Sequence, residues 1–313
     1  MPSTREPPDS LDAWILSQRS SKNPVDPARP YAFWVEKERA IDGQIEDVAT
    51  IFLTNKECPF RCLMCDLWKN TTDQPVVPGA IPGQIRWALN QLPPAQGVKL
   101  YNSGNFFDPQ AIPEVDYALI ADSVSMFQRV IVESHPRMIG RRCLAFQELV
   151  TGQLEVAMGL ETVHPEVLPK LNKRMTLADF ERATGTLRRN QVQVRAFILL
   201  RPPYLTEQEG IFWAKRSVDF AFDVGVDCCI LIPTRGGNGV METLAEQGLF
   251  EPPTLDSMEE VLDYGIALGH GRVFADLWDV EKLSHNGRAN IACIERLRRM
   301  NLTQSLEPRV EIG

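Results

Sequence analysis

The sequence lacks the long apolar segments of an integral membrane protein, because no run approaches the roughly 20 residues that a membrane-spanning helix needs. Its opening residues, MPSTREPPDSLDAW, contain no apolar stretch of the kind that secretory signals carry. The chain also has no internal repeat and no long low-complexity segment. We therefore expect a cytoplasmic protein with no membrane partner.

Positive charge is in short supply as well. The chain has 33 Lys and Arg against 41 Asp and Glu, which gives a formal net charge of −8. This balance does not favour bulk electrostatic binding of nucleic acid, although it leaves room for a local basic patch. The seven cysteines are odd in number and clustered, which does not suit a disulfide framework. We expect a reducing compartment, where thiolates serve metal or redox chemistry.

The fold is predicted from six short apolar strand candidates that alternate with amphipathic stretches. These candidates lie at residues 48–54, 98–103, 129–134, 154–161, 192–200 and 226–233. Such alternation predicts a parallel sheet with right-handed crossovers, and six units fall short of the eight that close a barrel. We predict an α/β fold: a partial (βα)6 TIM-type barrel core at 46–250, an N-terminal arm and hairpin at 1–45, and a C-terminal helical extension at 251–313.

Local signals support this organisation. The stretch SLDAWILSQRS (10–20) favours a short helix, and Asp42-Gly43 is a strong hairpin turn signal between two apolar runs. Two helix starts carry the spacing of a capping box, in which a threonine precedes an acidic residue by three positions. These pairs are Thr176 with Asp179 and Thr206 with Glu209.

Polar residues and glycines follow almost every predicted strand. The first strand runs directly into the segment NKECPFRCLMCDLWKN, and the later strands end in residues 102–105, 133–135, 159–162, 201–203 and 233–237. In α/β barrels the functional groups collect at the carboxyl ends of the strands. We therefore expect all of these segments to meet at one rim.

Cys58, Cys62 and Cys65 fall within eight residues, and three interpretations of them compete. The first is a set of buried, unreactive thiols. The second is a structural zinc site, which needs a fourth protein donor; the candidates are His135, Cys228, Cys229 and Cys293. The third is an iron–sulfur cluster, in which three thiolates leave one iron without a protein ligand and open to chemistry.

The run Cys58-Pro-Phe-Arg-Cys62-Leu-Met-Cys65 resembles the CxxxCxxC signature of the radical SAM superfamily. The resemblance implies a [4Fe–4S] cluster on these three cysteines, S-adenosylmethionine (SAM) on the fourth iron, and a reductant such as ferredoxin or flavodoxin. An electron from the cluster then cleaves SAM to a 5′-deoxyadenosyl radical that abstracts hydrogen from substrate. Two positions depart from the pattern: Met64 replaces a common aromatic residue, and Phe197 replaces a ribose-binding Asp of some relatives.

The resemblance also implies a set of SAM-binding residues. Ser103 and Gly104 lie where the family has a glycine-rich strand end that approaches the methionine amino group, and glycine there lets backbone come close to ligand. Glu133 resembles an acidic residue that contacts that amino group. Glu161 occupies a ribose-contacting position, and Lys173 lies where a basic residue pairs with the SAM carboxylate.

Over about residues 45–260, runs such as KLYNSGNFFDP and GLETVHPEVLPKLNKRMTLADFERA resemble the archaeosine synthase β-subunit group of the Elp3-like radical SAM enzymes. That resemblance implies C–N bond cleavage on a modified 7-deazaguanine in tRNA, with tRNA or a partner subunit as partner. A small molecule or peptide is an alternative substrate, and a zinc-stabilised binding protein is the non-enzyme alternative. A basic collar for tRNA would use Arg137, Arg141, Arg142, Lys170, Lys173, Arg174, Arg201 and Arg235.

Overall fold

The computed structural model describes residues 10–283 and 287–310. The strands are β1 (Ala32–Arg39), β2 (Ile45–Phe52), β3 (Gly97–Tyr101), β4 (Arg129–Glu133), β5 (Gln153–Glu161), β6 (Gln193–Leu200), β7 (Cys228–Pro233) and β8 (Arg272–Ala275). The α-helices are α1 (Leu11–Gln18), α2 (Ala80–Leu89), α3 (Tyr117–Ser123), α4 (Arg141–Leu149), α5 (Val167–Lys170), α6 (Leu177–Arg189), α7 (Glu207–Asp223), α8 (Val240–Glu246), α9 (Leu255–Leu268) and α10 (Gly287–Thr303). Short 3-10 helices span Leu67–Asn70, Glu114–Asp116, Pro136–Met138 and Val280–Leu283.

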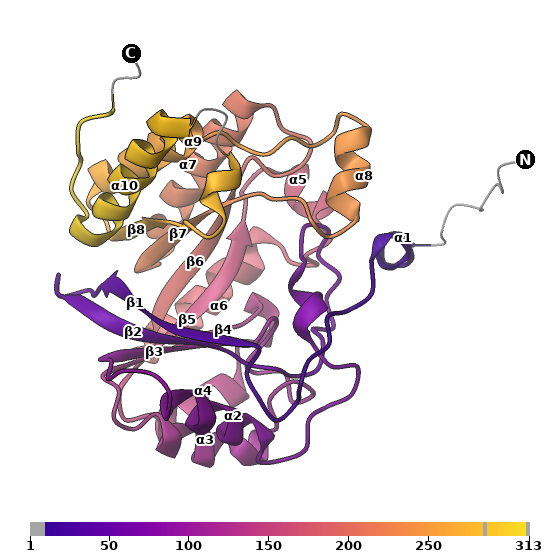
Figure 1. Ribbon diagram of the computed structural model, residues 1–313, viewed down its shortest axis with the longest axis vertical. Coiled ribbons are helices and arrows are strands. Elements are labelled where there is room, and N and C mark those ends of the chain that lie inside the picture. Colours follow the sequence, from indigo (N-terminus) through magenta and orange to yellow (C-terminus); the bar gives the residue numbers. More distant parts are fainter. Residues whose placement is uncertain (1–9, 284–286, 311–313) are drawn as a thin grey trace, which may run out of the picture.

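The eight strands form one sheet in the order in which they occur in the chain. β1 and β2 pair antiparallel, and every later neighbour pairs parallel. The sheet curls into a half-barrel, as Figure 1 shows. All six predicted parallel strands are present, and the prediction of a partial α/β barrel is confirmed.

The region after residue 250 differs in one respect from the helical extension that we predicted. It contains α9 and α10, but between them β8 adds a seventh parallel strand to the sheet. β8 has only four residues and all are buried, so it shows neither the length nor the alternation that identify a strand in sequence. Both regions outside 46–250 thus contribute strands to the sheet, and the division into three units stays a prediction.

The local signals in the sequence act as expected. β1 and β2 form a hairpin in which Gly43 has φ +88°, a conformation that glycine adopts without strain. The helix at the N-terminal arm is α1, capped by the Ser10 side chain. Both predicted capping boxes are formed, at the starts of α6 and α7.

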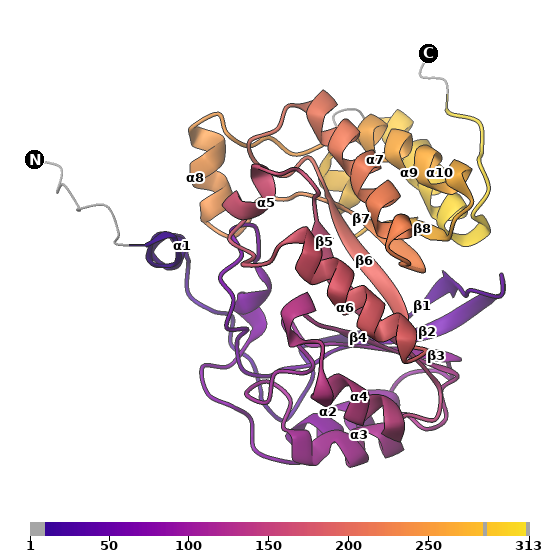
Figure 2. The same ribbon diagram turned by 180° about the vertical axis from the view of Figure 1, so that it is seen from behind.

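The main core lies between the convex face of the sheet and its helices (Figure 2). Alternate residues of each strand point outward into it, as the two-residue period of a strand requires. On β5 these outward residues are Leu154, Val156, Met158 and Leu160. Cys143, Cys229 and Cys293 are buried in the same core, and Cys228 packs in a smaller cluster with Ile230 and Phe274.

Charged side chains fill the inside of the barrel at the amino ends of the parallel strands. Glu155 of β5 is fully buried and binds Arg195 of β6 at 2.5 Å and Arg272 of β8 at 3.3 Å. Glu38 of β1 completes the cluster through Arg129, Arg195 and Lys99. Because cationic side chains from four strands converge on the carboxylates of two others, they can meet only on the concave side. This ionic cluster forms the floor of the barrel.

Aromatic side chains lie beside the floor on the same concave side. Tyr101 of β3 contacts Phe52 of β2 and Phe197 of β6 with ring-centroid distances of 5.9 and 6.3 Å. Trp34 of β1 contacts Phe52 and stacks on Trp278, which follows β8. The stacked pair links the two edges of the half-barrel, because β1 and β8 are the edge strands.

Candidate active site

The carboxyl ends of the strands form a rim at which α1, α5 and α8 gather (Figure 1). Three of the strand tips hold a non-glycine residue in the left-handed region: Ser103 after β3, Glu161 at the end of β5 and Arg201 after β6, with φ of +53°, +65° and +51°. Such backbone conformations cost free energy and persist where packing enforces them, often at functional sites. The rim is therefore the candidate functional region of the barrel.

The cysteine loop leaves the end of β2 and lies at this rim, as predicted. Its conformation is fixed from outside: the Leu63 N–H donates to the Leu171 carbonyl at 2.9 Å, and the Asn238 side chain donates to the Leu63 carbonyl at 2.8 Å. Leu63 also packs against Ile15 of α1, so the N-terminal arm covers the loop. Arg19 of the arm binds Glu57, which precedes Cys58, at 2.7 Å.

The three thiols are close enough to influence one another. Burial raises the pKa of Cys58 and of Cys65 to about 12 and that of Cys62 to about 11, and a neighbouring thiol adds to the effect in each case. The Lys173 ammonium opposes the rise in pKa at Cys58 and Cys62, and Arg19 opposes it at Cys65. Thiolates at this position therefore need added positive charge, which a metal centre supplies. The donor set fits an iron–sulfur cluster, whose irons prefer thiolate ligands.

Gly104 is required by the approach of strand tip and loop. A Cβ atom at Gly104 would lie 3.1 Å from the Cβ of Cys58, which is tighter than ordinary packing. The neighbouring Asn105 side chain donates to the Cys58 sulfur at 3.1 Å. Gly104 thus lies beside the cysteines, and the contact with SAM that the resemblance implies for it stays a prediction.

Glu133 ends β4 and is bound by backbone amides of the β3 tip. It accepts hydrogen bonds from the N–H groups of Asn102 at 2.6 Å and Gly104 at 3.3 Å. Burial nevertheless raises the pKa of Glu133 to about 7. The adjacent Ser103 hydroxyl contacts the Tyr31 hydroxyl at 2.9 Å. Ser103, Gly104 and Glu133 thus lie together at the rim. A cationic ligand there would stabilise the ionised form of the Glu133 carboxyl group.

Glu161 and Lys173 form a buried ion pair, with Lys173 Nζ 2.5 Å from Glu161 Oε1. A Cβ at Gly159 would overlap both groups, so glycine makes room for the pair. Although burial opposes the charged form, Glu161 and the Cys62 thiol raise the pKa of Lys173 above its ordinary value. The resemblance implied contacts with separate parts of SAM, whereas the structure pairs the two side chains with each other.

Some rim residues were not identified as functional from the sequence. Asn102 is fully buried, and neither polar atom of its side chain has a partner within the described residues. Buried polar groups usually have one, so these atoms suit a bound ligand. The other residue is Asn105, in the same quoted segment. A run of two asparagines around Ser-Gly at a strand end was the available signal.

The side chains proposed as zinc donors do not converge in the described part of the chain. Within residues 10–283 and 287–310, no group of three or more His, Cys, Asp or Glu side chains is placed to hold a single metal ion. A [4Fe–4S] cluster does not require the three sulfur atoms to converge on one ion, because each thiolate binds a different iron. The proposed fourth donors also lie elsewhere or are engaged: Cys228, Cys229 and Cys293 are in apolar clusters, and His135 Nε2 contacts the Lys173 carbonyl at 2.8 Å.

The predicted basic collar is largely neutralised by ion pairs within the chain. Its paired members are Arg141 and Arg142 with Glu114, Lys173 with Glu161, Arg174 with Asp12, Arg201 with Glu207 and Glu251, and Arg235 with Asp276. Among the described ion pairs, none involves Arg137 or Lys170. The rim therefore offers little free positive charge to a phosphate backbone.

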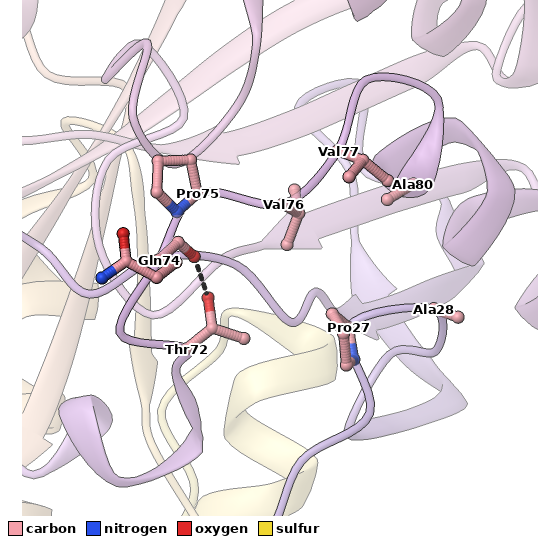
Figure 3. Close-up of a pocket in the computed structure, with 8 residues that line it drawn as sticks. All are labelled: Pro27, Ala28, Thr72, Gln74, Pro75, Val76, Val77 and Ala80. Carbon is pink, nitrogen blue, oxygen red and sulfur yellow. Dashed lines mark hydrogen bonds between the residues drawn. The ribbon is translucent and has the colours of Figure 1, made fainter.

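An apolar pocket lies between the N-terminal arm and the later part of the loop from β2 to α2, and it offers no catalytic group. Figure 3 shows its eight lining residues, which are Pro27, Ala28, Thr72, Gln74, Pro75, Val76, Val77 and Ala80. Its volume is about 290 Å³, and no lining residue is titratable. The only hydrogen bond drawn there joins the Thr72 hydroxyl to the Gln74 carbonyl. None of the three loop cysteines and none of the predicted SAM-binding residues lines this pocket.

No helix in the described part of the chain has both the length and the apolar character needed to cross a bilayer.

No family model matches the sequence. The chain is 26% identical over 269 residues to an archaeosine synthase subunit beta from Methanosarcina acetivorans, which covers 81% of this chain and 77% of the relative.

Two solved structures share the fold. Elp3 from Methanocaldococcus infernus, with an N-terminal deletion, has a TM-score of 0.51 and 15% identity over 69% of this chain and 57% of its own. Streptococcus suis SuiB bound to S-adenosylmethionine has a TM-score of 0.52 and 12% identity over 71% of this chain and 48% of its own. This chain thus spans only about half the length of these two proteins.

Proposed function

We propose that this chain, which is related to the Elp3-like radical SAM proteins, is itself a radical SAM enzyme. The observation that carries the proposal is the meeting of three thiols with Gly104 and the buried polar residues of the strand tips at the rim of a half-barrel. In this proposal Cys58, Cys62 and Cys65 hold a [4Fe–4S] cluster. Ser103, Gly104, Glu133, Glu161 and Lys173 contact SAM.

When bound and reduced, the cluster supplies an electron that cleaves SAM to a 5′-deoxyadenosyl radical. In this proposal the side chains of the protein bind SAM and orient it. The Glu133 carboxylate, held by two backbone N–H groups, attracts the SAM ammonium. Lys173 places a positive charge beside the thiols and the SAM carboxylate, and Glu161 keeps it charged. The ionic floor closes the barrel below the rim and excludes water from that side.

The proposed substrate is a modified 7-deazaguanine in tRNA, on which the enzyme cleaves a C–N bond. The proposal is supported by the sequence similarity to an archaeosine synthase subunit beta. Because most cations of the collar already have acidic partners, we propose that a partner subunit supplies the contacts to tRNA phosphates. A ferredoxin or flavodoxin would supply the electron.

The same paired collar favours a second candidate, a small molecule or peptide that needs no phosphate contacts. Anaerobic incubation of the reconstituted protein with SAM and dithionite tests both candidates. Formation of 5′-deoxyadenosine is expected, and its absence would refute radical SAM activity. A change in a tRNA nucleoside on mass analysis, with or without a partner subunit, would select tRNA; deoxyadenosine formation with no tRNA change would favour the small substrate.

Replacing Glu133 with alanine is expected to weaken SAM binding while the cluster is kept. A hydrogen bond to a charged group contributes about 1.5–3 kcal/mol, so the dissociation constant should rise roughly 10- to 150-fold. The measurement is SAM binding to the reconstituted protein by equilibrium dialysis, with iron and sulfide assayed in the same sample. Exposed Glu181 on α6 gives a control, Glu181→Ala, which should bind SAM normally. Equal affinity in both variants would contradict a role for Glu133.

A further inference from the structure

Asn105 joins the tip of β3 to the first cysteine of the loop. Its side-chain NH₂ donates to the Cys58 sulfur at 3.1 Å. Its Oδ1 accepts from the His135 backbone N–H at 2.6 Å. Only the oxygen of an amide can accept from an N–H group, so this second bond turns the NH₂ toward the sulfur. Asn105 is only 1% exposed, and a hydrogen bond shielded from water is stronger than an exposed one.

His135, whose backbone N–H donates to Asn105, is itself held in place by its ring. His135 Nδ1 accepts from the Arg137 N–H at 3.1 Å, so Nε2 carries the ring hydrogen and donates to the Lys173 carbonyl at 2.8 Å. The His135 ring stacks on Phe60, with centroids 3.8 Å apart and planes 9° from parallel. Phe60 belongs to the cysteine loop. The strand tips thus contact the cysteine loop both at Cys58, through Asn105, and at Phe60, through His135.

We propose that Asn105 is a positioning residue that donates to the sulfur of Cys58 in the loaded protein and makes the bound cluster easier to reduce. This inference rests on the proposed function, because it requires a cluster on Cys58. The physical reason is that a hydrogen bond to a ligating sulfur withdraws electron density, and this stabilises the reduced form, which carries one more negative charge. The amide is neutral, so its effect comes from the bond and its direction.

The test is an EPR-monitored redox titration of reconstituted protein in the absence of SAM. Asn105→Asp keeps an acceptor for the His135 N–H and loses the donor, and Asn105→Ala loses both. Both variants should keep their iron and sulfide, and both midpoint potentials should become more negative, that of the aspartate variant further. Asn190→Ala is the control, since Asn190 is the C-cap residue of α6 and bonds within that helix. A midpoint equal to that of the unmodified protein in either cluster-loaded variant would overturn the proposal.

A second measurement covers the case in which both variants lose the cluster. Unmodified protein is produced with asparagine that carries heavy nitrogen in its side-chain amide, and the reduced cluster is examined by pulsed EPR. A nitrogen coupling that changes with the label is expected, because the donor nitrogen lies next to a sulfur that carries unpaired spin. A spectrum that is indifferent to the label would overturn the proposal. A protein that cannot hold any cluster refutes the proposed function instead, so the two failures are distinguishable.

Discussion

Replacing Cys58, Cys62 or Cys65 with alanine is expected to remove the cluster and abolish SAM cleavage. A cluster that already has only three protein ligands cannot lose another and stay attached, so iron should fall from about four per chain to near zero in each variant. The loop should stay near its place in the apo protein, because the backbone bonds that anchor Leu63 to Leu171 and Asn238 are kept in all three variants. Iron and sulfide analysis, the visible spectrum and 5′-deoxyadenosine assay measure the effect.

Cys143→Ala is the matched control for these variants. Cys143 is a buried core residue of α4, and its replacement should leave iron content and SAM cleavage unchanged while costing about 1 kcal/mol of stability. Full iron and sulfide in any one of the three loop variants would exclude that cysteine as a ligand. Loss of iron in the Cys143 variant would instead show that the assay reports on folding.

Glu155→Gln is expected to lower the free energy of unfolding by about 3–5 kcal/mol, because it leaves buried cations without their counter-ion. Glu155 has no exposed side-chain surface, and it faces Arg195, Arg272 and Arg129. Glutamine keeps the shape of the side chain, so the loss reports on charge. Urea unfolding of the apo protein, followed by circular dichroism, measures the change. The control Lys37→Ala breaks an exposed pair with Asp47 and should cost at most about 1 kcal/mol.

The same carboxylate predicts how stability depends on pH. Although burial opposes ionisation, Arg195, Arg272 and Arg129 lower the pKa of Glu155 from an ordinary 4.5 to about 2. A group whose pKa is lower in the folded state stabilises the fold above its unfolded pKa. The contribution of Glu155 is therefore complete above pH 4.5 and is lost as the pH falls toward 2. The difference in stability between Glu155→Gln and the unmodified protein should shrink over that range; a constant difference would contradict the assigned ionisation.

Elements fixed by short-range patterns were predictable from the sequence. The six parallel strands, the Asp42-Gly43 turn and the two capping boxes depend on residues that are close in the chain, and all are present. The meeting of strand tips at one rim was also predictable, because parallel strands have a common direction. β8 was missed because four buried residues carry too little pattern.

Long-range pairings were not predictable in this way. Lys99, Arg129 and Arg195 each look like ordinary surface residues when considered singly, and only the curl of the sheet brings them to Glu38. Their position on the otherwise apolar strands was a signal, since a charge in a buried strand needs a partner. The pairing of Lys173 with a residue 12 positions away depends likewise on the turn after β5.

The ionic floor described above blocks the end of the half-barrel that lies opposite the rim. Glu155 and Arg195 occupy the bottom with almost no exposed surface, and the Trp34–Trp278 stack links the edge strands. A ligand therefore cannot reach the strand tips by passing through the floor.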